Sequence, residues 1–480
     1  MSEVKTENTR GFSRKMTMAD KIKCALWSIL IILFAVWMVS FVPLLALPFV
    51  VDLYWTHFIK WDWWKEIKNS FLRGVMSWVD AIVFALCAVW ILQNFFFQNF
   101  QIPTTSLEKT MLAGDYLLVS KYHYGPRVPM TPLSLPLFQH TITIGGKDLG
   151  KSYLEKPQIP YRRMKGLKDV ERYDIVVFNY PNGDTVATKH QDDDYYRLKF
   201  HNGVKSMHSN KNLYGDIIYR PVDRRENYVK RCIGLPGDML EIVNDDVMIN
   251  GQKLEDPRYL QHNYFIITTP GNMIADRTWR NLGVYNSDLY EITNPQVNLA
   301  LGLEPDSISG ASSKVYLSPL TAEMKTKLLQ LKTVKDIVVV PAEFFGKDYV
   351  YPLSETNTWT RSNYGPIFIP KAGSTVELSP ENIALYERCI KVYEGNDFEV
   401  KENGVCMING KPASEYTFKM DYYWMMGDNR DNSADSRYWG FVPEDHIVGT
   451  PLFVWLSIDK ETGEWRKDRI LKRVSSIGKE

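Results

Sequence analysis

The chain has 480 residues, a formal net charge of +1 and five cysteines. Its length suits a membrane anchor plus one or two folded domains. The balanced charge and the lack of a recognition motif argue against nucleic-acid binding. The cysteines and histidines are scattered, without zinc-ligand spacing or a disulfide framework, so we expect neither a metal nor a cofactor.

Two apolar segments lie near the N-terminus. Residues 24–51 carry no charged side chain, and residues 74–92 carry only Asp80 and precede an aromatic run at 94–100. Both segments can cross about 30 Å of hydrocarbon. A cleavable signal peptide is disfavoured because the first segment is too long and no small-x-small site follows it directly. The sequence therefore predicts that residues 1–100 anchor the chain in a lipid bilayer through one or two transmembrane segments. The alternative is a pair of buried helices in a soluble domain.

The basic residues around these segments give an ambiguous orientation. Six precede the first segment and four lie between the two: Lys5, Arg10, Arg14, Lys15, Lys21 and Lys23, then Lys60, Lys65, Lys68 and Arg73. This bias weakly places the N-terminus inside, and two full spans would then leave the C-terminal part inside as well. Either the first segment is a re-entrant hairpin broken at Pro43 and Pro48, or the loop charges dominate.

From residue 101 onward, short β-rich runs alternate with turns. The runs are 116–120, 174–178, 227–233, 247–249, 337–340, 405–408 and 447–453, and Pro-Gly or Asn-Gly turns follow several of them. This pattern predicts a mainly β protein, with an antiparallel β-sheet domain behind N-terminal transmembrane helices. We assign that domain to 101–252 and 381–458, an inserted segment of unknown role to 253–380, and a C-terminal tail to 459–480.

A weak internal echo links two parts of this region. An Arg-Cys-Ile triplet at 231–233 and again at 388–390 is followed in both cases by a hydrophobic run ending in Asn-Gly. We interpret the echo as two similar β-hairpins.

Three polar stretches carry candidate chemistry. Residues 101–115 cluster hydroxyls around Ser106, residues 228–238 place Lys230 in an apolar strand, and residues 425–440 are dense in charged and amide side chains. Each has a structural alternative: a helix cap at Ser106, a lysine that reaches to solvent, and a solvated loop.

These three stretches closely resemble the sequence boxes of type I signal peptidases, in the same order. The last box reads GDNRDNSADSR from Gly427, and the lysine box reads KRCIGLPGD from Lys230. The resemblance implies that Ser106 is the nucleophile and Lys230 the general base. It further implies an oxyanion hole formed by the Ser106 N–H and the Thr104 hydroxyl. The supporting residues it implies are Ser433, to orient the amine, and Asp435, Arg437 and Arg231.

The serine box departs from the common form of the family. Thr104 and Thr105 replace Ser and Gly, Leu107 replaces Met, and Lys109 stands where Pro is common. These changes leave Ser106 in register. They alter the surroundings of the oxyanion hole.

The chemistry of the residues agrees with this assignment. A serine hydroxyl needs an adjacent base, and a lysine can serve if burial lowers its pKa by about two to four units from about 10.4. Lys109 is closer in sequence, but Glu108 beside it favours the ammonium form. We therefore expect Lys230, in its apolar strand, to be the base, and Lys109 to be dispensable for most activity.

The expected substrates are signal peptides of exported preproteins, with small residues at the −1 and −3 positions, bound as an extended strand. The implied location is the bacterial cytoplasmic membrane, with the catalytic domain on the outer, periplasmic face. Two other functions remain open. One is a penicillin-recognising enzyme, since residues 106–109 spell SxxK, although its S-D-N and K-T-G partners are missing. The other is a non-enzymatic membrane-tethered β module.

Overall fold

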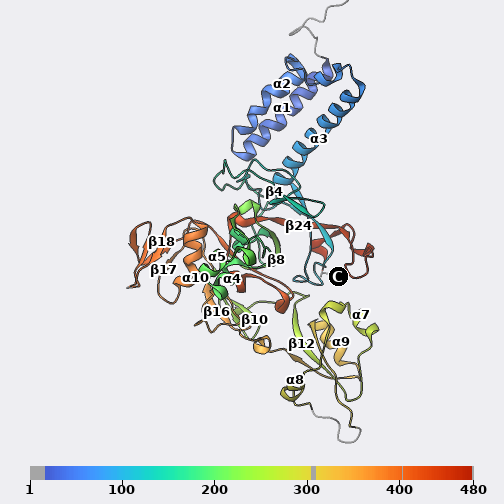
Figure 1. The fold of residues 1–480 in the computed structure, drawn as a ribbon, viewed down its shortest axis with the longest axis vertical. Helices are drawn as coiled ribbons and strands as arrows, with labels where there is room; N and C mark the ends of the chain where they lie inside the picture. Colours follow the sequence, from blue (N-terminus) through green and yellow to red (C-terminus); the bar gives the residue numbers. More distant parts are fainter. Residues whose placement is uncertain (1–16, 304–309, 403, 478–480) are drawn as a thin grey trace, which may run out of the picture. The chain divides into compact units, whose positions relative to one another are not determined.

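The computed structural model describes residues 17–303, 310–402 and 404–477. Two long apolar helices near the N-terminus precede a series of mostly antiparallel β-sheets (Figure 1), so the predicted mainly β class is confirmed. The chain divides into two compact units, Met1–Gln98 with Lys121–Lys168 and Asn99–Ser120 with Asp169–Glu480.

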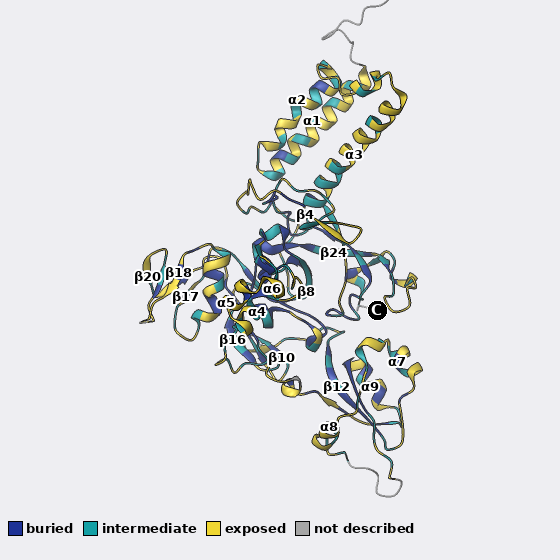
Figure 2. Cartoon of the chain, viewed as in Figure 1, coloured by how far each residue is buried: buried dark blue, intermediate teal, exposed yellow. Residues whose placement is uncertain are grey.

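The first unit contains the apolar helices. Helix α1 (Met18–Met38) and helix α3 (Ser70–Phe95) are each long and apolar enough to cross a membrane. The colouring by burial in Figure 2 shows that their residues are largely exposed, which suits a lipid environment better than a soluble core. Between them, η1 (Val42–Ala46), α2 (Leu47–Val51) and η2 (Asp52–Thr56) form a shorter apolar helical segment that packs against α1.

The break in the first apolar run differs from the prediction. Helix α1 ends at Met38, and the chain turns at the capping residue Val39, whose φ of 48° is left-handed, rather than at the prolines. Pro43 instead lies in the first turn of η1, where a missing backbone N–H costs nothing. A left-handed valine has no sequence signature, which explains why the turn was misplaced.

Helices α1 and α3 run in the same direction. Phe34 near the end of α1 meets Phe95 at the end of α3 with ring centroids 5.1 Å apart. Trp37, Trp90 and Met164 join the same apolar cluster. The Val42–Thr56 segment, which lies between them in the sequence, must therefore run in the opposite direction to both helices.

Residues 121–168 cover this end of the helices. They include the hairpin of β3 (Thr141–Ile144) and β4 (Lys147–Lys151). Trp37 Nε1 donates to the Lys165 carbonyl at 3.0 Å, and Arg162 donates to the Val39 carbonyl at 3.0 Å. These bonds satisfy backbone carbonyls where α1 leaves its apolar environment.

The central sheet of the second unit joins segments that are far apart in sequence. Its order is β1-β2-β24-β5-β8-β22-β23. The strands are β1 (Phe97–Gln101), β2 (Asp115–Ser120), β5 (Ile175–Asn179), β8 (Asn227–Gly234), β22 (Tyr422–Met426), β23 (Val442–Pro443) and β24 (Ile447–Ser457), with β25 (Lys472–Arg473) beside β24. Alternating apolar side chains from β2, β5 and β24 form one buried core beneath it.

A larger core lies beside this sheet, under β9 (Met239–Val243), β10 (Asp246–Ile249), β11 (Gln252–Lys253) and β16 (Tyr364–Phe368). Smaller sheets extend it: β17 (Thr375–Glu377) with β21 (Glu415–Thr417), and β18 (Phe398–Val400) with β19 (Cys406–Ile408) and β20 (Lys411–Ala413). Strands β6 (Thr185–Ala187) and β7 (Ile217–Tyr219) form another antiparallel pair. In the sequence, the short helices α4 (Tyr195–Asn202), α5 (Val204–Ser209) and α6 (Lys211–Tyr214) lie between these two strands.

The prediction of two similar β-hairpins is confirmed for the Asn-Gly turns but is wrong for the second Arg-Cys-Ile triplet. Both Asn-Gly turns do close hairpins, with left-handed Asn250 and Asn409. The second Arg-Cys-Ile triplet is helical, because it spans the end of α10 (Ile383–Arg388) and the start of η8 (Cys389–Tyr393). Cys389 and Ile390 are fully buried there, so tertiary packing selects the helix over the strand.

Within the predicted insert lies a sheet of order β13-β14-β12-β15. Its strands are β12 (Gln261–Thr268), β13 (Tyr290–Ile292), β14 (Val315–Thr321) and β15 (Val334–Val339). Helices α7 (Asp276–Leu282) and α9 (Ala322–Leu329) join a core on one face, and α8 (Pro295–Ala300) joins a core on the other. Every residue of β14 is buried, so this segment has a hydrophobic core of its own.

Candidate active site

Ser106 lies on the loop of residues 102–114 that joins β1 to β2, which we call the serine loop. The loop is closed by a hydrogen bond from the Ile102 N–H to the Asp115 carbonyl at 2.8 Å. Leu107 and Met111 anchor it in the core beneath the central sheet, and the Met111 N–H donates to the Leu107 carbonyl at 2.7 Å. Ser106 itself is only 7% exposed.

Lys230 lies in β8, opposite Val176 of β5. Its side chain does not reach to solvent: Lys230 is 5% exposed, and its Nζ lies 2.7 Å from Ser106 Oγ. That separation lets the amine, when neutral, accept the hydroxyl proton directly. The two residues therefore have the geometry of a nucleophile and its base.

Burial lowers the pKa of Lys230 to about 8, because the apolar surroundings disfavour the charged ammonium. The nearby carboxylates of Asp435 and Asp428 oppose this effect by favouring the charge. At a pH slightly above neutral, a substantial fraction of the amine is therefore free of its proton.

Both of those carboxylates are paired with arginines. Arg437 holds Asp435 through Nε at 2.9 Å and a terminal nitrogen at 2.8 Å. Arg231 forms a similar bidentate ion pair with Asp428, through hydrogen bonds of 2.7 and 2.6 Å. Although burial raises the pKa of Asp435, the Arg437 guanidinium holds it below its ordinary value. The two ion pairs offset the field that bare carboxylates would exert on Lys230.

The loop after β22 holds the backbone of the nucleophile. The Asn429 N–H donates to the Ser106 carbonyl at 3.1 Å, and its side-chain amide donates to the Thr105 carbonyl at 3.3 Å. Gly427 leaves the required space, since a Cβ there would lie 2.5 Å from the Ser106 carbonyl oxygen and 2.3 Å from Ser433 Oγ. Sequence reasoning assigned no role to Gly427 or Asn429, although both belong to the box that it singled out.

Two other residues expected in the site, Thr104 and Ser433, differ in how they lie relative to Ser106 and Lys230. Thr104 is exposed, with its hydroxyl oxygen 3.5 Å from Ser106 Oγ. Ser433 is buried against Gly427. No hydrogen bond joins Ser433 Oγ to Lys230 Nζ among the residues that the structure describes. The roles of Thr104 in the oxyanion hole and of Ser433 in orienting the amine remain predictions.

One buried contact comes from the predicted C-terminal tail. Arg469 donates two hydrogen bonds to Asp115, at 2.6 and 3.2 Å, and one to the Thr110 carbonyl at 3.0 Å. It thereby fixes the distal end of the serine loop. No sequence signal identified this arginine, because its partner precedes it by 354 positions.

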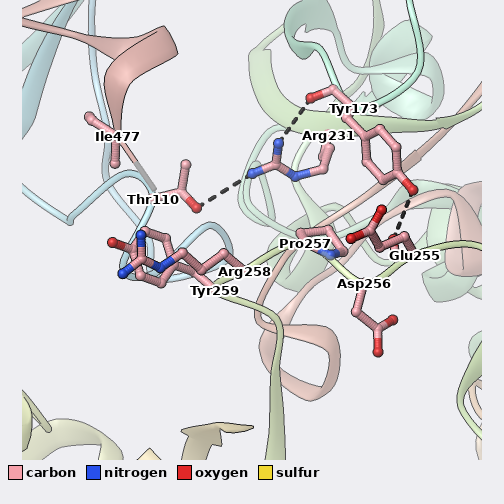
Figure 3. Close-up of a pocket in the computed structure, with 9 residues that line it drawn as sticks. All are labelled: Thr110, Tyr173, Arg231, Glu255, Asp256, Pro257, Arg258, Tyr259 and Ile477. Carbon is pink, nitrogen blue, oxygen red and sulfur yellow. Dashed lines mark hydrogen bonds between the residues drawn. The ribbon is translucent and has the colours of Figure 1, made fainter. Parts of the chain in front are cut away.

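A pocket of about 250 Å³ lies next to Arg231 (Figure 3). Arg231 donates to the Tyr173 carbonyl at 2.9 Å and to the Thr110 hydroxyl at 3.5 Å, and these three residues form one side. The rest of the lining comes from Glu255, Asp256, Pro257, Arg258, Tyr259 and Ile477. Ser106 and Lys230 are not among the lining residues.

A buried serine paired with a buried lysine, on an antiparallel β-sheet behind apolar helices, is the arrangement of a membrane-bound serine hydrolase with a lysine base. The sequence profile of the family described as signal peptidase, peptidase S26, matches residues 75–278 and 369–456. The chain belongs to this family, and it is accordingly a peptidase. The matched region omits 279–368, most of the predicted insert.

Curated relatives support the same family over most of the chain. It is 23% identical to signal peptidase I of Buchnera aphidicola subsp. Acyrthosiphon pisum over 428 residues, which cover 85% of this chain and 83% of the relative. It is 24% identical to signal peptidase I of Haemophilus influenzae, with 84% and 75% covered. Signal peptidase I of Pseudomonas fluorescens is 21% identical, with 78% and 69% covered.

Proposed function

We propose that this membrane-anchored peptidase removes N-terminal signal peptides from exported preproteins, with Ser106 as the nucleophile and Lys230 as the general base. The observation that carries the assignment of residues is the 2.7 Å separation of Lys230 Nζ and Ser106 Oγ in a buried setting. Family membership supports the reaction class, since the matching profile is that of signal peptidases.

In this mechanism the neutral Lys230 amine takes the Ser106 proton as Oγ attacks the scissile carbonyl. The resulting oxyanion accepts hydrogen bonds from the Ser106 N–H and the Thr104 hydroxyl. The tetrahedral intermediate then collapses, and the Lys230 ammonium gives its proton to the departing amine of the mature protein. The acyl-enzyme is hydrolysed by a water that Lys230 deprotonates in the same way.

The proposed substrates carry small side chains at the −1 and −3 positions. A signal peptide presents that pattern at the end of an apolar segment. In sequence, Ser106 follows the apolar helix α3 after the single strand β1. A short stretch of chain therefore joins the nucleophile to an apolar helix long enough to cross the membrane.

The parallel course of α1 and α3 supports an outward catalytic domain. The return segment Val42–Thr56 is about 22 Å long at 1.5 Å per residue and would bring the chain back across most of the hydrocarbon. With three crossings, the N-terminal region and the 57–69 loop share one side. Lys21 and Lys23, and then Lys60, Lys65 and Lys68, therefore all favour the same cytoplasmic face. The remaining N-terminal basic residues, Lys5, Arg10, Arg14 and Lys15, lie outside the described residues.

This arrangement removes the conflict between charge and function. The domain that follows α3 would emerge on the periplasmic face of the bacterial cytoplasmic membrane, where preproteins arrive. The conflict arose from counting two spans.

A purified full-length preparation in detergent tests the proposal. A preprotein with an Ala-x-Ala site should be cut once, directly after the second alanine, as mass spectrometry of the products would show. A bulky residue at −1 should block the cut. Acylation by a β-lactam without peptide cleavage would support the SxxK alternative instead, and neither reaction would support a non-enzymatic module.

A further inference from the structure

Lys109 connects the serine loop to residues 254–363, which lie between β11 and β16 and which we call the inserted segment. Its Nζ donates to the carbonyl of Gly283 and lies 5.9 Å from the centre of the Tyr285 ring. Glu108 Oε1 is 4.0 Å from the same nitrogen. The contact joins residues 174 positions apart.

The acceptor is well suited to a cation. Gly283 caps the C-terminus of α7, and carbonyls at a helix C-terminus carry partial negative charge. Gly283 has a φ of 70°, and a Cβ there would lie 3.2 Å from Lys109 Nζ. Glycine therefore serves both the helix cap and the approach of the lysine.

The backbone of Lys109 is itself unusual. Its φ of 69° is in the left-handed region, which costs a residue other than glycine about 1 kcal/mol or more. Such a conformation persists only where surrounding contacts hold it. The side-chain bond to Gly283 is one of those contacts. The turn bonds from Thr110 and Met111 to the Leu107 carbonyl, at 3.1 and 2.7 Å, transmit the position of Lys109 to the residue beside Ser106.

The inserted segment also contacts the loop that holds the Ser106 carbonyl. At the start of β12, the Gln261 N–H donates to the Asp428 carbonyl at 2.8 Å, and the Asn263 N–H donates to Asp431 at 2.7 Å. Asp428 and Asp431 flank Asn429, which binds the Ser106 carbonyl. The same segment therefore touches the nucleophile's surroundings at two separate places.

A third link leads through the C-terminal region. Arg466 donates to the Tyr285 hydroxyl at 2.9 Å and to the Ala113 carbonyl at 3.0 Å. The inserted segment therefore binds the middle of the serine loop at Lys109. It also contacts Arg466, which binds the end of the loop at Ala113.

We propose that the inserted segment braces the serine loop through Lys109, which makes Lys109 a positioning residue for Ser106. The proposal rests on the peptidase function above. Lys109 does not touch the substrate or the reacting atoms in this scheme. It fixes the turn that carries Ser106, so that Oγ stays within reach of Lys230 and of the scissile carbonyl.

The test compares Lys109→Met with Lys109→Arg and with Lys335→Met, a change of an exposed lysine on β15 of the same segment. Lys109→Met keeps the length of the side chain but loses the donor. We expect it to lower kcat about three- to tenfold, with KM nearly unchanged, and to slow acylation in single-turnover experiments. Lys109→Arg should restore most of kcat, and Lys335→Met should match the wild type.

Gly283→Ala probes the same contact from the other side and should lower kcat to a similar extent. The double variant with Lys109→Met should be no slower than the slower single variant, because both changes remove one interaction. A folded Lys109→Met with the kcat of the wild type overturns the brace, as does strict additivity of the two changes. If Lys109→Met does not fold, an unchanged kcat in Gly283→Ala overturns it. Failure of the wild type and of Lys335→Met to cut any preprotein refutes the peptidase function instead.

Discussion

Lys230 and Ser106 are 124 positions apart in the chain, yet Lys230 Nζ and Ser106 Oγ lie 2.7 Å apart. The two atoms meet because β8 lies against the serine loop. The next residue of the strand, Arg231, binds Asp428 and also donates to the hydroxyl of Thr110 in that loop. A single strand therefore supplies both the candidate base and the cation that neutralises a nearby carboxylate.

Replacement of the nucleophile should abolish processing and leave the fold intact. Ser106→Ala removes the oxygen that attacks the carbonyl in the proposed mechanism, while the bonds from Asn429 use backbone atoms that the substitution retains. We expect cleavage of a small-x-small preprotein to fall to background, with a thermal unfolding midpoint close to that of the wild type. Residual cleavage near the wild-type rate would remove Ser106 from the mechanism.

The pH dependence should report the state of Lys230. The amine acts as a base only without its proton, and burial places its pKa at about 8. Activity should therefore rise with pH through that value and level off above it, and fall about tenfold per pH unit well below it. The measurement is kcat/KM for one peptide substrate from pH 6 to 10. A profile that is flat across pH 7 to 9 would contradict a titrating lysine base.

Metal removal should have no effect. The proposed mechanism needs no ion, and the described residues contain no cluster of three or more potential metal ligands. In the acidic run at 192–194, Asp194 caps α4 and accepts hydrogen bonds from Tyr180 and Asn182, so its carboxylate is occupied by protein donors. Assays with and without a strong chelator should give the same rate. A large loss that zinc or calcium restores would argue against a pure serine–lysine mechanism.

The sequence predicted the local features well. Strands such as β8 and β10 follow from alternating apolar residues next to Pro-Gly and Asn-Gly turns, which fix the pairing over a few residues. Ser106 and Lys230 were identifiable from their boxes. Contacts such as Lys109 to Gly283 were not, because a backbone carbonyl has no sequence signature and the partners lie far apart. The left-handed turn at Val39 was missed because a valine in that conformation has no sequence signature either.

Membrane topology gives a prediction that depends on the proposed crossing by Val42–Thr56. If Val42–Thr56 returns across the bilayer, the domain after α3 lies outside and the 57–69 loop lies inside. Protease added to intact spheroplasts should degrade the chain beyond residue 101. A protease site engineered into the 57–69 loop should be cut only after the membrane is permeabilised. Full protection of the C-terminal domain in sealed spheroplasts would reverse the topology.

The final prediction distinguishes the two lysines near Ser106. Lys109 is closer in sequence, but its Nζ is bound to the Gly283 carbonyl and its neighbour Glu108 is 4.0 Å away. Burial lowers the pKa of both lysines, so geometry distinguishes them: Lys230 Nζ lies 2.7 Å from Ser106 Oγ. Lys230→Ala should therefore lose roughly 10³-fold or more in kcat/KM, as expected for loss of an activating base.

The sequence predicts that Lys109→Ala keeps most activity, but the contact with Gly283 predicts a loss of up to about tenfold in kcat/KM. Removing a positioning contact is still far milder than removing a base. It should also keep the same pH profile, since the group that titrates is still present. One peptide substrate measured across about pH 6 to 10 compares all three proteins. An inactive Lys109→Ala beside an active Lys230→Ala would make the local SxxK pair the dyad and would refute the mechanism proposed here.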